Sequence, residues 1–183
     1  RDRFMAAVLS NEITNTDKIA FFVSEAQRLG ITVLPPDINR SLLKFAPEPD
    51  FVPETPPAPP KLKEGQKDLH ARSRGRAIRF GLSAIKNVGL AAMEAVIAER
   101  TANGPFESME DFANRLDSKV VNKKILENLV KAGAFDFLGE PRAAMFGRIE
   151  HVIQAASAAH KDRASGQESL FDAMEFAAPA PTV

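Results

Sequence analysis

The chain of 183 residues contains no cysteine, tryptophan or tyrosine, and its formal charge at pH 7 is zero. Without cysteine no disulfide can form, so the composition is compatible with the cytoplasm, and we expect that location. No apolar run approaches the ~20 residues that a membrane span needs, and we expect no membrane partner. There is no initiator Met and no signal peptide, and the opening "RDRFMAAVLS" resembles the middle of a helix. We therefore expect a piece of a larger protein.

The charges are distributed unevenly along the chain. Residues 61–79 hold seven Lys and Arg against two Asp and Glu, with no Phe, Tyr or Trp. Such a basic run is either a solvated insertion or a source of loose phosphate contacts from Arg74, Arg76 and Arg79, and base stacking is not expected. The preceding stretch 47–60, "PEPDFVPETPPAPP", is too rich in proline to fold alone and predicts an extended loop.

Helical periodicity dominates the rest of the sequence. A helix is predicted over residues 15–29, with Gly30 as its stop. The prolines at 35–36 then predict a sharp turn. Residues 41–47 and 77–82 favour two short strands, which we expect to pair as a small β-hairpin with the proline-rich and basic stretches at its tip.

From Leu82 onwards the pattern is helical, with a first break at Val88–Gly89 and disorder expected beyond Ser165. Ser108 is a predicted helix cap, and Pro141 suits the first turn of a long helix. The predicted helices after the break cover residues 89–100, 108–116, 122–135 and 140–164.

Two of the helix breaks are alike: "NVGL" at residues 87–90 and "KAGA" at residues 131–134. Glycine permits positive φ and close approach of a ligand to the backbone. The next helix then points its free N–H groups and the positive end of its dipole outwards. A phosphate fits such a site, which reads the nucleic-acid backbone rather than the base sequence. For either turn alone, a plain helix end is the alternative.

The pair of turns resembles the tandem helix-hairpin-helix domain, which binds duplex DNA across the minor groove. The usual hairpin has a glycine, an apolar residue and a second glycine. Asn87 replaces the first glycine in one copy, and asparagine tolerates positive φ. Lys131 replaces it in the other copy, where its ammonium could touch a phosphate directly. The resemblance implies two sets of DNA-binding residues: Lys86, Asn87, Val88 and Gly89, and then Lys131, Ala132, Gly133 and Ala134.

Five stretches follow one another along the chain: "NTDKIAFFVSEAQRLGITVLPPDINRS", "IRFGLSAIKNVG", "NGPFESMEDF", "NKKILENLVKAGAFD" and "DRASGQESLFD". In this order they resemble the bacterial replicative DNA polymerase III alpha subunits of the C family. The resemblance implies a mainly α fold in three parts. These are the end of the fingers region with a helix and a small β-hairpin (1–80), a tandem helix-hairpin-helix domain (81–163) and a disordered tail (164–183).

The same resemblance implies a DNA-directed DNA polymerase whose catalytic aspartates lie upstream, in the palm. That chemistry uses two divalent metals held by carboxylates, so Mg²⁺ is expected for the parent polymerase. This chain has no Asp-x-Asp pair, and we predict no catalytic residue, metal ligand or cofactor within it. Glu110 and Asp111 indicate a solvated helix face, and His70, His151 and His160 lack the spacing of metal ligands.

The tail stretch "QESLF" resembles the clamp-binding pentapeptide of this family and implies that Gln167, Ser169, Leu170 and Phe171 bind the sliding clamp. Glu168 departs from the apolar residue that is usual at the second position. Burying the Leu and Phe contributes roughly 1.5–3 kcal/mol each, against at least ~4 kcal/mol of lost freedom. Binding is therefore weak unless DNA adds a second attachment. Alternatively, the two apolar residues fold back on the helix ahead of them.

The sequence thus predicts a noncatalytic segment of a replicative polymerase, with duplex DNA, the sliding clamp and other replicase subunits as partners. Two alternatives stay open: a helical adaptor whose hairpins bind protein, and a free-standing repair protein with tandem hairpins. Duplex binding that weakens with salt distinguishes the polymerase segment from the protein-binding adaptor, because phosphate contacts release counterions.

Overall fold

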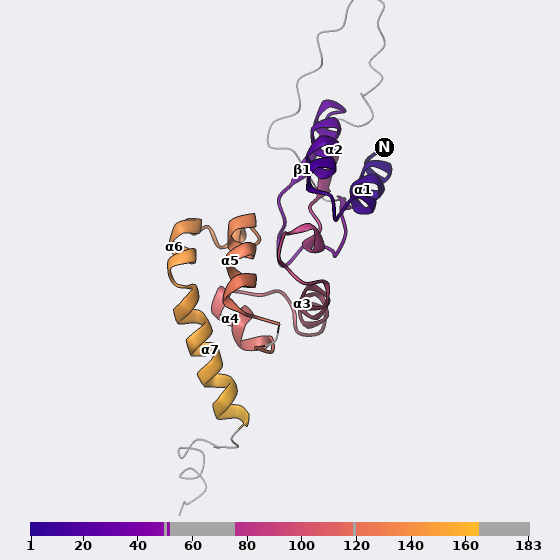
Figure 1. Ribbon diagram of the computed structural model, residues 1–183. Coiled ribbons are helices and arrows are strands. Elements are labelled where there is room, and N and C mark those ends of the chain that lie inside the picture. Colours follow the sequence, from indigo (N-terminus) through magenta and orange to yellow (C-terminus); the bar gives the residue numbers. More distant parts are fainter. Residues whose placement is uncertain (50, 52–75, 119, 165–183) are drawn as a thin grey trace, which may run out of the picture.

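The computed structural model describes residues 1–49, 51, 76–118 and 120–164 (Figure 1). The tail motif at 167–171, His70 and most of the basic run lie outside the described residues. The fold is mainly α, as predicted, with a small three-stranded sheet. In the described ranges no helix has the length and apolar character needed to cross a membrane.

Helices α1 (Asp2–Asn11) and α2 (Thr16–Arg28) pack against the sheet at one end of the molecule (Figure 1). Asn15 caps α2, because its side-chain oxygen accepts the Lys18 N–H at 3.1 Å. Gly30 follows the helix with φ 76°, a left-handed conformation that glycine adopts at little cost. The predicted start and stop of this helix are both confirmed.

The sheet has the strand order β1 (Ile31–Leu34), β3 (Arg76–Arg79), β2 (Ala46–Glu48). β2 and β3 are antiparallel, which is the predicted pairing, but β2 begins only at the end of the predicted strand. The chain ahead of β2 still pairs with the chain after β3, since Leu42 accepts the Leu82 N–H at 2.9 Å. β1 runs parallel to β3 and is not predicted, because two prolines follow it directly and suggest only a turn.

The rest of the described chain consists of short helices joined by turns. In Figure 1, α6 lies beside α5, and α7 continues from it along α4. Ser108 caps α4, as predicted, and accepts the Asp111 N–H at 3.0 Å. The single long helix predicted over 140–164 is wrong. It is two helices, because the Arg148 N–H bonds to Met145, three residues back, at 3.3 Å. The elements are η1 (Leu82–Ala84), α3 (Leu90–Asn103), α4 (Met109–Arg115), α5 (Lys123–Ala132), η2 (Asp136–Leu138), α6 (Arg142–Gly147) and α7 (Ile149–Ala164).

Two hydrophobic clusters form the core. One joins α1, α2 and the sheet, and the other joins η1 and the helices from α3 to α7. The loop between β1 and β2 connects them. Asn39 exchanges two hydrogen bonds with the backbone of Phe106, at 2.8 and 2.9 Å. Arg100 of α3 donates to the carbonyls of Ile38 and Ser41 at 2.6 and 2.5 Å. The predicted division at residue 80 stays a prediction.

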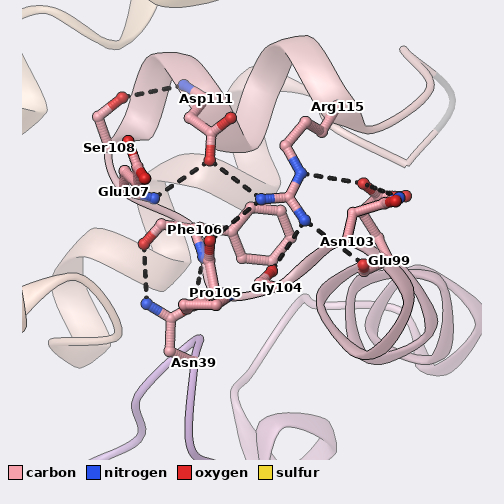
Figure 2. Close-up of polar contacts among 10 residues, drawn as sticks. All are labelled: Asn39, Glu99, Asn103, Gly104, Pro105, Phe106, Glu107, Ser108, Asp111 and Arg115. Atoms are coloured by element: carbon pink, nitrogen blue, oxygen red, sulfur yellow. Dashed lines mark hydrogen bonds and ion pairs between the residues drawn. The ribbon is translucent and has the colours of Figure 1, made fainter.

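The connection between α3 and α4 is held by Arg115 (Figure 2). Its Nε donates to Glu99 at 2.9 Å, and its terminal nitrogens donate to the Asp111 carboxylate at 3.2 Å and to the Gly104 carbonyl at 2.9 Å. The guanidinium also lies over the Phe106 ring, 4.4 Å from its centroid. These contacts fix the end of α3 against α4, and so connect the helix after the first turn to the helices around the second.

Candidate nucleic-acid interface

The first glycine turn connects η1 to α3. Val88 is buried, and its N–H bonds to the Ile85 carbonyl at 3.3 Å, which folds the chain back ahead of the helix. Asn87 has φ 62°, the one positive φ of a non-glycine residue in the described ranges. Asparagine therefore takes the conformation expected of the first glycine of a hairpin. Gly89 is extended, with φ −71° and ψ 143°, and so differs from the left-handed glycine predicted here.

α3 begins at this turn without a side-chain cap and without an acidic residue in its first turn. A Cβ built on Gly89 would meet nothing within 4 Å, and Leu90 beside it is exposed. The N–H groups of a first helical turn have no acceptor within their own helix. α3 is 14 residues long, and the positive end of its dipole lies at this first turn. The first turn thus has the open amides that a phosphate can bind.

The second glycine turn is the C-terminal cap of α5. Gly133 is left-handed, with φ 87° and ψ 17°. Its N–H donates to the Val130 carbonyl at 3.0 Å, and the Ala134 N–H donates to the Leu129 carbonyl at 2.9 Å, which is the Schellman pattern. Ala134 is fully buried, and its carbonyl accepts the Ile38 N–H at 2.9 Å. These two amides are satisfied within the protein, so the second turn differs from the open phosphate cradle that its sequence predicts.

Arg142, the first residue of α6, lies directly over Gly133. Its Nε and Nη2 donate to the two carboxylate oxygens of Asp136 at 2.8 and 2.5 Å, and its Nη1 donates to the Lys131 carbonyl at 3.1 Å. The hydrogen bond with Asp136 raises the pKa of Arg142 above its ordinary value. A Cβ on Gly133 would overlap the guanidinium and lie 2.7 Å from the Asp136 Oδ2. The positive φ favours glycine here, and any side chain would also displace the ends of Arg142 and Asp136.

Residues of both turns line one groove of about 490 Å³. The first turn contributes Lys86, and the second contributes Lys131 and Ala132. Lys86 is exposed. The Lys131 ammonium lies 4.9 Å from the centroid of the Phe146 ring and 3.9 Å from a Glu127 carboxylate oxygen, which orients it without burying it. One residue of the first predicted set and two of the second therefore meet at a single groove, which carries a lysine from each turn and is otherwise lined mainly by apolar residues.

Comparison with known proteins assigns the sequence to a family. Residues 30–145 match the family model described as the helix-hairpin-helix motif. The chain belongs to the helix-hairpin-helix family. The match covers both glycine turns and also extends over the sheet, so this helix-hairpin-helix unit includes the loop that connects the two hydrophobic clusters.

The helix-hairpin-helix chain is also similar to DNA polymerase III subunit alpha from several bacteria. It is 38% identical over 176 residues to the subunit of Borreliella burgdorferi, which covers 96% of this chain and 13% of the relative. It is 40% identical over 172 residues to that of Thermus aquaticus and 34% over 168 residues to that of Escherichia coli, covering 94% and 92% of this chain and 12% of each relative. The predicted resemblance is confirmed, and the chain spans about an eighth of the curated relatives it matches.

The arginines of the basic run that fall within the described residues have acidic partners. Arg76 donates to Asp2 at 2.7 Å, and Arg79 donates to Glu48 at 2.6 Å. These ion pairs connect β3 to α1 and to β2, respectively. Arg74 lies outside the described residues. Phosphate contact by this run stays a prediction, and for Arg76 and Arg79 the structure supplies a structural role.

The described ranges contain no group of three or more His, Cys, Asp or Glu side chains placed to hold a metal ion. The Mg²⁺ expected for the parent polymerase stays a prediction. Glu110 forms a surface ion pair with Arg148 at 3.7 Å. The His160 Nε2 lies 3.3 Å from the Ala113 carbonyl, which connects α7 to α4.

Two arginines with several structural contacts each, Arg115 and Arg142, are not predicted from the sequence. Arg115 carries a detectable signal, since Asp111 stands four residues before it on the same helix. Arg142 carries none. Its partner Asp136 is six residues away across a proline, and the chain turns between the two residues at Gly139, which is left-handed with φ 70°.

Proposed function

We propose that this chain holds duplex DNA for a replicative DNA polymerase alpha subunit, without preference for base sequence. The observation that carries the proposal is that Lys86 and Lys131, one from each turn, line the same groove. Phosphates repeat along a duplex and carry no sequence information directly. Two cationic turns on one groove therefore suit a grip on the backbone. The name of the relatives, DNA polymerase III subunit alpha, supports the replicative setting.

In this proposal the two turns grip the duplex differently. The first offers the amides at the start of α3, the helix dipole and the ammonium of Lys86. The second offers cations rather than amides, because its glycine amides are bonded within the protein. Neither contact depends on a base edge, which is what a protein that moves along DNA of any sequence requires.

Nucleotidyl transfer belongs, in this proposal, to another part of the parent polymerase, where carboxylates hold Mg²⁺. This chain contributes no reacting group. Its contribution is to keep the duplex bound between successive additions, so that the polymerase does not dissociate after each one.

We further propose that the tail tethers the sliding clamp through Gln167, Ser169, Leu170 and Phe171. The support is the resemblance of "QESLF" to the clamp-binding pentapeptide. The peptide alone binds weakly, and the complex gains strength because the clamp and the turns hold the same DNA. A weak tether of this kind can release at one point without losing the duplex.

A protein-binding surface is a second candidate, favoured by exposed aromatic side chains away from the groove. Phe4 of α1 and Phe21 of α2 are 71% and 64% exposed. Contiguous exposed apolar side chains are typical of protein contacts, and these two lie on helices that pack against each other. This surface would receive other replicase subunits, and it leaves the groove free for DNA.

Duplex binding is tested with the full chain on two unrelated duplexes of equal length, by fluorescence anisotropy between about 50 and about 200 mM salt. We expect equal affinities for the two sequences. With two to four phosphate contacts, the slope of log K against log salt should lie between about −2 and −4. Binding that ignores salt would favour the protein-binding adaptor, and a strong preference for one sequence would contradict a backbone grip.

Clamp binding is tested with the double variant Leu170→Ala, Phe171→Ala in a capture assay with the purified clamp. Capture should be lost while the duplex affinity stays unchanged. The matched control is Met174→Ala with Phe176→Ala, which removes similar apolar surface from the same tail outside the motif. If the motif variant still captures the clamp as well as the control does, the assignment is wrong.

A further inference from the structure

We infer that Arg142 contacts a phosphate of the duplex, so that the second turn grips DNA through a pair of cationic side chains, Arg142 and Lys131. This inference rests on the proposed function and extends its site to a residue that the sequence analysis does not single out. It also explains how a turn with no open glycine amides can still bind an anion.

The elements after the second turn leave little else for a phosphate to bind. The amides of Gly133 and Ala134 donate to carbonyls of α5. The next element, η2, has three residues, and α6 has six, too few for a strong helix dipole. The anion-binding capacity of this turn therefore resides in its side chains.

Arg142 has donors to spare. A guanidinium carries five N–H groups. Three of them are used, one on Nε and one on Nη2 by Asp136, and one on Nη1 by the Lys131 carbonyl. The two others, one on each terminal nitrogen, have no acceptor among the described residues, and 48% of the side chain is exposed. Free N–H donors on the terminal nitrogens of a guanidinium can bond to phosphate oxygens.

Arg142 lies beside the groove rather than among the residues that line it. Its Nη1 bonds to the carbonyl of Lys131, whose side chain lines the groove with Lys86. Asp136 and Gly133 hold the guanidinium in place from the other sides. Because the side chain is already ordered, a phosphate contact costs less conformational entropy than one made by a free arginine.

Asp136 has two opposing effects on this contact. Its carboxylate orients Arg142, but its negative charge repels a phosphate that approaches the same guanidinium. Removing the charge of Asp136 and removing that of Arg142 should therefore change duplex affinity in opposite directions. If the ion pair were purely structural, both variants would destabilise the turn and would change duplex affinity in the same direction.

The test measures duplex affinity and its salt slope for Arg142→Gln, Asp136→Asn and Arg148→Gln in the full chain, with thermal unfolding as a check on folding. Arg148→Gln is the matched control, since it removes the same charge from the end of the same helix, where the side chain pairs with Glu140 at 3.0 Å. Arg142→Gln should weaken binding by roughly five- to tenfold and reduce the magnitude of the slope by about 0.9. Asp136→Asn should keep or increase the affinity, and the control should change it by less than about twofold.

The inference is overturned if Arg142→Gln matches Arg148→Gln in affinity and slope, or if Asp136→Asn weakens binding as much as Arg142→Gln does. In either case the proposed function stands provided that the wild-type chain binds DNA with the expected salt slope and Lys86→Gln weakens it. If the wild-type chain fails to bind duplex DNA, the proposed function and this inference fail together.

Discussion

The two turns have similar sequences and line the same groove, yet they use glycine for different purposes. Gly89 is extended and has open space beside it, while the positive φ falls on Asn87. Gly133 is left-handed and lies beneath Arg142. The difference follows from the next element, a 14-residue helix after the first turn and a three-residue 3₁₀ turn after the second. A glycine between two helices thus indicates a turn, but its contacts depend on the chain around it.

The largest effect is expected for Gly133→Ala. The new Cβ would enter the space of Arg142 and Asp136 at a positive φ, so the variant should lose about 2–3 kcal/mol of unfolding free energy in a urea titration. Gly89→Ala should stay within about 0.5 kcal/mol of wild type, because a weaker N-cap is offset by a less flexible unfolded chain. Equal losses at the two positions would remove the contrast between the turns.

A smaller loss is expected for Asn87→Ala, because alanine is less tolerant of φ 62° than asparagine. The variant should be less stable by about 1 kcal/mol, whereas Asn87→Gly should be at least as stable as wild type at this angle. Both values come from urea unfolding. If alanine and glycine are tolerated equally, the left-handed conformation assigned to this position is wrong.

Gly89→Ser separates stability from binding at the first turn. A serine N-cap accepts a hydrogen bond from an amide of the first turn of α3, so the variant should gain roughly 0.5 kcal/mol of stability. The same bond occupies a donor that a phosphate would use, so duplex affinity should fall by about two- to fivefold. Gly147→Ser, at another glycine with open space beside it, serves as the control for binding. A serine variant that is more stable and binds DNA as wild type does would exclude these amides from the contact.

The smallest effect concerns Glu99, which bonds to Arg115, the arginine that fixes the end of α3 against α4. Hydrogen bonds from Arg115 and then Asn103 hold the pKa of Glu99 below its ordinary value of 4.5. Because the folded pKa is the lower one, this contribution to stability is present above pH 4.5 and is lost as the pH falls through the folded value. Urea titrations of wild type and Glu99→Gln should therefore converge as the pH is lowered below about 4.5. A constant difference across this range would show that the carboxylate charge is not what stabilises the connection.

Local patterns predict the helices and their ends well. The N-caps are Asn15 for α2 and Ser108 for α4, and α2 is followed by the left-handed Gly30. These residues could be predicted because capping depends on neighbours in sequence. Strand β1 escapes prediction, since a four-residue strand is defined by its distant partner β3. The break at Arg148 between α6 and α7 directly follows Gly147, and a lone glycine inside a helical pattern does not by itself predict the end of a helix.

The residues of the candidate site stay a prediction, and their contacts could not be inferred from the sequence. Lys86 and Lys131 do meet at one groove, as a tandem pair of hairpins implies. The backbone N–H groups of Gly133 and Ala134 bond to carbonyls of α5. These hydrogen bonds could not be inferred from the turn sequence "KAGA" alone. The arrangement of Arg142 and Asp136 over Gly133 depends on how the chain returns after η2.

The most direct test of the shared groove is the salt dependence of duplex binding for Lys86→Gln, Lys131→Gln and the double variant. Lys124→Gln, an exposed lysine on the same helix as Lys131, is the control. If both turns grip one duplex backbone, each single variant should reduce the magnitude of the slope by about 0.9 and the double variant by about 1.8, with little change in the control. Slopes that stay at the wild-type value, or that change no more than in Lys124→Gln, would contradict a backbone grip by the two turns.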